Sequence, residues 1–189
     1  DATSNTRQKA PFIDVITVQG PIMLEGESLA AANANTLAEL IRQSRSDPHT
    51  GAIVVRVDSP GGSQFASELI RQELELAQLS GTPVVASFAS AAASGGYWVA
   101  ATADEIVAEA TTITGSIGIF SLLMTYEQTL SEFGIHTDGI GTSTNTNGLG
   151  LMTGINANMA DLFQSQVEHG YEQFIGLVAK GREKSIEDV

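Results

Sequence analysis

The chain has 189 residues, of which 42% are hydrophobic and 16% charged, and these proportions are typical of one folded domain with an apolar core. Its formal net charge of -13 argues against nucleic acid and anionic membrane surfaces as partners. The chain has no cysteine, which excludes disulfides and thiolate metal sites, and no spacing in it resembles a zinc or calcium site. We therefore expect neither a metal nor a cofactor.

The N-terminal part predicts a polar tail, a strand and a helix. Residues 1–11 are polar and lack the apolar centre of a signal peptide. Residues 12–18 predict a strand that ends at Gly20, and Ser28 is placed to cap the helix that follows. The apolar residues expected on that helix are Leu29, Leu37, Leu40 and Ile41.

A second strand leads into a glycine turn. Residues 54–58 are mostly β-branched, and Pro60-Gly61-Gly62 follows them directly. A helical pattern then places Ala66, Leu69, Ile70, Leu74 and Ala77 on one face.

A serine stands at the next junction between a strand and a helix. Residues 82–86 predict a buried strand, residues 92–98 read Ala-Ala-Ser-Gly-Gly-Tyr-Trp, and residues 97–101 begin an apolar helix. A sharp turn at such a junction holds the Ser94 hydroxyl clear of the backbone, as a nucleophile requires. The alternative is an ordinary tight turn with a capping serine.

The two glycine turns are expected to lie together. Two successive strand–turn–helix units favour neighbouring parallel strands, and sites form at the carboxyl ends of such strands. Glycines there can present backbone N–H groups to one serine hydroxyl, which makes an oxyanion hole.

Three blocks carry a resemblance to one family: residues 56–63 (Arg-Val-Asp-Ser-Pro-Gly-Gly-Ser), residues 92–98, and residues 112–120 (Thr-Ile-Thr-Gly-Ser-Ile-Gly-Ile-Phe). In order and spacing they resemble the signal peptide peptidase A family, also called protease IV, a group of bacterial serine peptidases. The resemblance extends from about Phe12 to the C-terminus. It implies a Clp protease/crotonase-like α/β fold, a stack of ββα units, over a single domain at residues 12–189.

The resemblance also implies the catalytic residues. The family uses a serine nucleophile and a lysine general base, without a catalytic histidine. By motif match, Ser94 is the nucleophile, and Gly95 and Gly62 are the oxyanion donors.

The lysine base is the part that the chain does not supply. A base lysine must be buried to be neutral, because an exposed lysine titrates near ~10.4. The lysines are Lys9 in the polar tail and Lys180 and Lys184 in a charged helix end. Short family members place the lysine in a stretch matching residues 140–147, where this chain has none. The chain instead resembles the C-terminal half of the long members, whose N-terminal half carries the lysine.

The expected substrates are peptides bound in an extended form. Glycine-rich edges leave backbone donors and acceptors free, so an added strand is expected beside Gly61, Ser116 and Ile117. The resemblance implies cleaved signal peptides and other hydrophobic peptides as substrates, and a ring-like homo-oligomer. It also implies a parent protein anchored by a membrane helix, at the periplasmic face of the bacterial inner membrane.

The remaining elements complete an α/β pattern. Residues 105–108 and 116–119 predict short strands, and residues 141–150 a polar loop. The uncharged run at residues 76–103 contains one proline, Pro83, and glycines and serines that divide it, so it is core and not a membrane span. A long helix is predicted by the apolar stripe of Met159, Leu162, Phe163, Val167, Tyr171, Phe174, Ile175 and Val178.

Three alternatives stay open. Ser94 could form a triad with His136 and Asp138, whose side chains would share one side of a strand, whereas His49 and His169 have polar neighbours typical of the surface. A crotonase-like acyl-CoA enzyme would use the glycine oxyanion hole without a nucleophile. A non-catalytic assembly domain of the same fold would need neither.

Overall fold

The computed structural model describes residues 10–25, 30–143, 145–146 and 148–189. The chain divides into two compact units. The first comprises the described residues up to Gly118 together with Phe174–Val189, and the second is Ile119–Gln173. Lys9 and most of the predicted polar tail lie outside the described residues, as do Ser28 and Leu29.

The first unit alternates strands and helices, as the sequence predicts. Its elements are β1 (Phe12–Gln19), β2 (Ile22–Met23), β3 (Ala32–Asn33), α1 (Ala34–Ser46), β4 (Thr50–Ser59), α2 (Gln64–Leu79), β5 (Val84–Ala93), α3 (Gly95–Ala100), β6 (Glu105–Val107) and β7 (Ile113–Gly115). The C-terminal part of α5 (Ala157–Arg182) and a 3-10 turn (Ile186–Asp188) also belong to this unit.

The main sheet is parallel, with the strand order β1-β4-β5-β6. Strands β4 and β5 are hydrogen-bonded neighbours, which confirms the prediction from the two strand–turn–helix segments. Strand β7 pairs with the last three residues of β5, beyond the point where β6 stops. The carboxyl end of β5 therefore lies between β4 on one side and β7 on the other.

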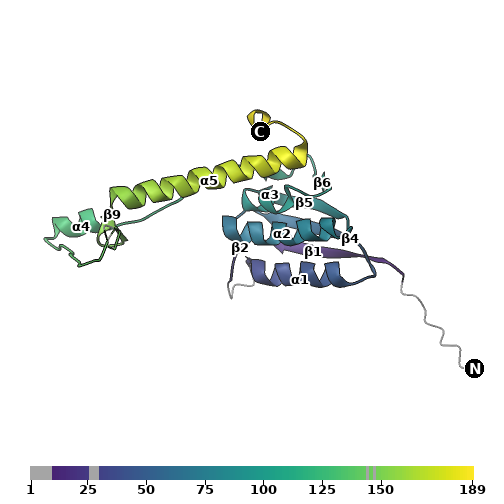
Figure 1. Cartoon of the computed structure of the whole chain (residues 1–189), viewed down its shortest axis with the longest axis horizontal. Coiled ribbons are helices and arrows are strands. Elements are labelled where there is room, and N and C mark those ends of the chain that lie inside the picture. Colours follow the sequence, from purple (N-terminus) through teal and green to yellow (C-terminus); the bar gives the residue numbers. More distant parts are fainter. Residues whose placement is uncertain (1–9, 26–29, 144, 147) are drawn as a thin grey trace, which may run out of the picture. The chain divides into compact units, whose positions relative to one another are not determined.

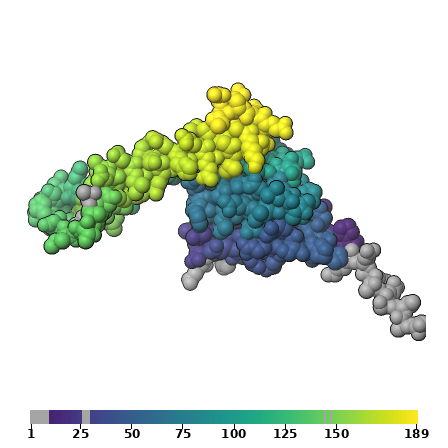
Figure 2. Space-filling model, in the orientation of Figure 1, coloured from purple at the N-terminus to yellow at the C-terminus, as the bar shows by residue number. Residues whose placement is uncertain are grey.

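The core lies between the sheet and the helices α1 and α2, which run side by side (Figure 1). Along β4, Ile53, Val55 and Val57 are fully buried while Arg56 between them is exposed, so alternate side chains face the core. Figure 2 shows α1 and α2, blue to teal, as part of the surface of this unit.

Helix α1 begins later than the sequence suggests. Its cap is Asn33, whose side chain accepts a hydrogen bond from the Thr36 N–H at 3.0 Å. Leu37 and Ile41 are buried as expected, but Leu40 is exposed.

The prediction of a strand at residues 116–119 is wrong. The strand lies three residues earlier, at Ile113–Gly115. The backbone turns at its end because Gly115 and Ser116 both have positive φ angles, 84° and 51°. A left-handed backbone cannot continue a strand.

The second unit contains α4 (Glu127–Glu132), β8 (Leu149–Gly150), β9 (Gly154–Ile155) and the N-terminal part of α5. The predicted long helix is confirmed, but its apolar stripe is buried only toward its C-terminal end. Phe174 and Val178 are buried, whereas Leu162 and Tyr171 are nearly half exposed.

The described residues contain no helix that is long and apolar enough to cross a membrane. Within the same residues, no three histidine or carboxylate side chains group in a way that could hold a metal ion.

Candidate active site

Ser94 occupies a strained turn between β5 and α3. Its backbone angles are φ 51° and ψ −121°, a conformation that costs on the order of 1–3 kcal/mol in a residue other than glycine. Its N–H donates to the Gly115 carbonyl and its carbonyl accepts from the Trp98 N–H, both at 2.9 Å. The backbone on both sides therefore holds the turn in place.

The Ser94 hydroxyl is not used to cap the helix. Ser94 stands at the position before α3, yet its side chain makes no capping hydrogen bond. Ser63, at the same position before α2, does cap its helix and accepts from the Ala66 N–H at 3.3 Å. The capping alternative considered for Ser94 is therefore wrong.

The two glycine turns lie against each other, as the sequence predicts. A Cβ atom on Gly61 would stand 2.7 Å from the Gly95 nitrogen and 2.8 Å from the Ser94 Cβ. A Cβ atom on Gly95 would stand 3.1 Å from the Gly62 nitrogen. Only glycine at these positions allows the two turns to approach this closely.

The Gly62 N–H is left out of the hydrogen bonds that hold its own turn. Ile22 donates to the Gly61 carbonyl and accepts from the Ser63 N–H, each at 2.9 Å, so it bridges the residues on either side of Gly62. Gly62 itself is exposed. Its N–H therefore stands near Gly95 at the surface of the turn.

Two residues that sequence reasoning did not single out shape these turns. The buried Ser59 hydroxyl donates to the Gly20 carbonyl at 2.7 Å and accepts from the Gly61 N–H at 3.1 Å. Asp58 accepts from the Ala91 N–H at 3.1 Å through its Oδ1 atom. The signal for both was a polar pair at the end of an otherwise apolar strand.

The Asp58 bond lies at an irregularity in β5. Val57 pairs with Phe88 but Ser59 pairs with Ala92, so β5 has two more residues than β4 over this interval. Bulges of this kind are common next to active sites, where they redirect the strand. Here the bulge directly precedes the turn that carries Ser94.

A partly buried charged network ties α2 to α3. Glu68 Oε2 accepts from the Trp98 indole N–H at 2.7 Å and from Arg71 Nε at 2.7 Å. Burial acts to raise the pKa of the Glu68 carboxyl, but hydrogen bonds from Arg71, Trp98 and Gln72 outweigh it and hold the pKa below its usual value. Glu68 is therefore ionised at neutral pH, beside a fully buried tryptophan.

Helix α5 also packs against α3. The Trp98 and Phe174 rings lie 4.6 Å apart between centroids. The Tyr97 hydroxyl accepts from Arg182 at 2.9 Å from Nε and 2.6 Å from a terminal nitrogen. The helix that follows Ser94 is thus held on two sides.

The remaining predicted site residues follow β7. Ser116 is exposed and Ile117 half-buried. The preceding residue, Gly115, accepts the Ser94 N–H bond, so the start of this segment is fixed next to Ser94.

The two lysines that the structure describes are exposed, as the sequence predicts. Lys180 is exposed and its Nζ atom bonds Glu75 Oε1 at 2.9 Å, and Lys184 is also exposed. His136 and Asp138 are exposed in the second unit, on a segment that forms no strand, so the predicted strand there is wrong. The Asp138 carboxylate accepts from the Gly139 N–H at 2.7 Å.

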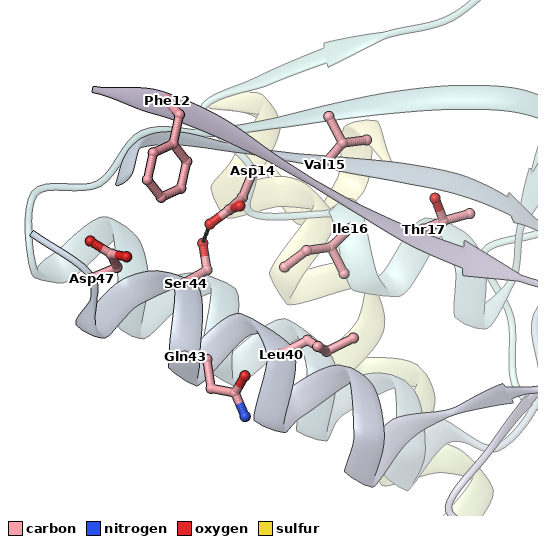
Figure 3. Close-up of a pocket in the computed structure, with 9 residues that line it drawn as sticks. All are labelled: Phe12, Asp14, Val15, Ile16, Thr17, Leu40, Gln43, Ser44 and Asp47. Atoms are coloured by element: carbon pink, nitrogen blue, oxygen red, sulfur yellow. Dashed lines mark hydrogen bonds between the residues drawn. The ribbon is translucent and has the colours of Figure 1, made fainter. Parts of the chain in front are cut away.

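A hollow lies between β1 and α1 (Figure 3). Its volume is about 370 Å³, and none of the predicted site residues lines it. The Ser44 hydroxyl points at the Asp14 carboxylate across it and donates a hydrogen bond to that group. We assign this hollow no part in the candidate active site.

The fold defines a class of proteins. Among solved structures, a ClpP1 variant from Listeria monocytogenes matches with a TM-score of 0.56 over 92% of this chain and 75% of its own, at 13% sequence identity. A match at this identity shows the fold alone. The chain has the mixed α/β fold of Clp proteases, as predicted.

The sequence defines the family within that class. The profile of peptidase family S49 matches residues 77–189, and the chain belongs to this family. Protease 4 of Haemophilus influenzae is 44% identical over 174 residues, covering 92% of this chain and 28% of that protein. Serine protease SPPA, chloroplastic, of Arabidopsis thaliana is 34% identical over 172 residues, covering 90% and 25%. The chain thus spans about a quarter of the length of these relatives. The acyl-CoA enzyme and the non-catalytic domain are not favoured.

Proposed function

We propose that the chain carries the nucleophile and the oxyanion hole of a serine peptidase. One observation carries the proposal. Ser94 lies on a strained turn that packs against the Gly61-Gly62 turn, and its hydroxyl does not cap the helix that follows. Membership of peptidase family S49 and the names of the relatives, Protease 4 and Serine protease SPPA, support it.

In the proposed reaction the Ser94 oxygen attacks the carbonyl carbon of a peptide bond. The carbonyl oxygen then becomes an anion, which accepts hydrogen bonds from the N–H groups of Gly62 and Gly95. Loss of one such donor commonly slows a reaction by about 100- to 1000-fold. The serine proton passes to a general base and then to the leaving amine as the C–N bond breaks, and water then hydrolyses the ester formed on Ser94.

The base is a lysine supplied from outside this chain. A neutral base requires a desolvated amine, and Lys180 and Lys184 are both exposed. Resemblance to the C-terminal half of long family members supports a lysine on a preceding half. The 189-residue chain alone is then expected to fold but to hydrolyse peptides poorly.

The substrate is an extended hydrophobic peptide, such as a cleaved signal peptide, that lies beside Gly61, Ser116 and Ile117. Fixed backbone at Gly115 and the exposure of Ser116 support an edge of this kind. The functional domain is residues 12–189 taken together.

The assembled enzyme is a homo-oligomer. The second unit exposes Phe120, Leu122, Phe133 and Ile140 by three-quarters or more, and a monomer rarely leaves so much apolar surface in water. The parent protein is membrane-anchored, at the periplasmic face of the bacterial inner membrane.

Replacement of the proposed nucleophile tests this function. In the complete protein, Ser94→Ala should lower kcat for a hydrophobic peptide by about 10⁴-fold or more, because members of a catalytic unit fail together. Fluorophosphonate should modify Ser94, as mapped by mass spectrometry. The control is Ser90→Ala, an exposed serine earlier on β5, which should keep full activity. Undiminished hydrolysis by Ser94→Ala would rule out the proposed nucleophile.

A further inference from the structure

The two proposed oxyanion donors lie where two helices begin. Helix α2 begins two residues after Gly62, and α3 begins at Gly95. The distance between the two N–H groups therefore depends on how α3 is placed against α2.

A partly buried charged bond joins these helices, six residues after Gly62 and three residues after Gly95. Glu68, on α2, accepts the Trp98 indole N–H of α3 at 2.7 Å. Arg71 holds both oxygens of the same carboxylate, through Nε at 2.7 Å and a terminal nitrogen at 2.8 Å. Only 4% of Arg71 and 1% of Trp98 are exposed. The acceptor is thus fixed in direction as well as in position.

Arg71 extends the same link past the end of α3. Another of its nitrogens donates to Glu75 Oε2 at 2.9 Å and to Thr102 Oγ1 at 3.2 Å. Arg71 therefore contacts the chain after α3, while Glu68 contacts α3 itself.

The bond also controls rotation of α3 about its axis. Successive residues of an α-helix are 100° apart, so Trp98 lies within about 60° of Gly95 on the same side of the helix. Turning α3 to move the indole nitrogen away from Glu68 would move the Gly95 N–H as well. Ring packing of Trp98 on Phe174 alone would leave this rotation less restricted.

Stability alone does not require a charged bond at this place. Apolar residues of similar size commonly replace buried ion pairs without loss of stability. A hydrogen bond from an indole N–H differs from apolar packing because it has a required direction.

We propose that Glu68 is a positioning residue, which through Trp98 sets the rotation of α3 and so the gap between the N–H groups of Gly62 and Gly95. This inference rests on the proposed function, because it assigns that gap a role in holding the oxyanion.

Four variants of the complete protein test it, with hydrolysis of a hydrophobic peptide as the assay. Glu68→Ala should lower kcat about tenfold or more and leave KM within about twofold, because the misplaced donor acts on the transition state. Trp98→Phe keeps a ring on Phe174 but lacks the N–H, and should give the same loss. The double variant should lose no more than either single variant.

The control is Glu73→Gln. Glu73 is a buried glutamate of α2 that also has two arginine partners, but these are Arg42 and Arg45 of α1. Its kcat should match that of the wild type. A further readout is the amide resonances of Gly62 and Gly95 in the 189-residue chain, which Glu68→Ala should shift and Glu73→Gln should not.

The outcomes separate the two proposals. No hydrolysis by the wild-type protein, or full hydrolysis by Ser94→Ala, would overturn the proposed function and this inference with it. Hydrolysis that requires Ser94 but is unchanged in Glu68→Ala, or in Trp98→Phe, would overturn this inference alone. Equal losses of kcat in Glu68→Ala and Glu73→Gln would also overturn it, since they would reflect a general loss of structure.

Discussion

At the scale of single residues, the site depends on a conformation that its sequence pattern only suggests. Ser94 and Ser63 both stand immediately before a helix, yet only the Ser63 side chain makes a capping hydrogen bond. The difference lies in the backbone, because Ser63 has the extended conformation usual for a capping residue, with φ −61° and ψ 124°, whereas Ser94 has a positive φ. The strain is maintained by bonds to Gly115 and Trp98.

The stability that ionised Glu68 contributes should depend on pH. Its pKa is lower in the folded protein than in the unfolded chain, so its ionised form contributes stability above the unfolded pKa, and this contribution is lost as the pH falls through the folded pKa. Glu68→Gln should therefore be less stable than the wild type near pH 7, and the difference should shrink below about pH 4.5.

Urea unfolding of the 189-residue chain at several pH values measures this difference, followed by the fluorescence of its single tryptophan, Trp98. Asp161→Asn, an exposed carboxylate of α5, is the control and should change little. A wild-type to Glu68→Gln difference that stays constant from pH 7 to pH 3 would contradict the assignment.

The sequence led to Ser94 and its neighbouring glycines because each has a local signal. Strand, turn and helix patterns are contiguous, and glycine pairs mark close approaches. Glu68 has no such signal, and Asp58 is marked only as part of a polar pair at the end of an apolar strand. On the helical pattern Glu68 looks like any solvated carboxylate, and only the tertiary fold places Trp98 and Arg71 beside it.

At the scale of elements, the packing of α5 on α3 depends on one glycine. A Cβ atom on Gly181 would lie 1.8 Å from the Ala101 carbonyl oxygen, so no side chain fits without moving the backbone. This close approach brings Arg182 within reach of Tyr97.

Two identical substitutions on α5 test that dependence. Gly181→Ala should lower the free energy of unfolding by about 1–3 kcal/mol, because the added methyl group overpacks the contact. Gly176→Ala, which meets nothing within 4 Å, should raise it by up to about 1 kcal/mol through helix propensity. Chemical denaturation measures both, and similar values for the two variants would show that the contact is not tight.

Elements with a regular spacing of apolar residues were predictable from the sequence. Element boundaries set by an unusual backbone conformation or an unexpected cap were not. Helix α5 and strands β4 and β5 follow their apolar patterns. The strand expected at residues 116–119 failed because Ser116 adopts a positive φ that its residue type does not announce. The start of α1 shifted because Asn33 caps it.

At the scale of the whole molecule, the chain combines a packed parallel sheet with a second unit that leaves apolar side chains exposed. Phe120 and Ile140 are almost fully accessible, in contrast to the buried residues of β4. The sequence predicted the Clp protease-like fold through its family blocks. The sequence did not identify a buried lysine that could act as the base, and the structure shows Lys180 and Lys184 both at the surface.

The most direct test of the proposed nucleophile and oxyanion hole is a crystal structure of the complete protein with a peptide boronate, a tetrahedral mimic of the intermediate. We expect a bond from boron to the Ser94 oxygen, and one boronate oxygen within about 2.7–3.1 Å of the backbone nitrogens of both Gly62 and Gly95. A boronate bonded to another residue, or one whose oxygen faces away from both nitrogens, would contradict the roles proposed for Ser94 and the two glycines.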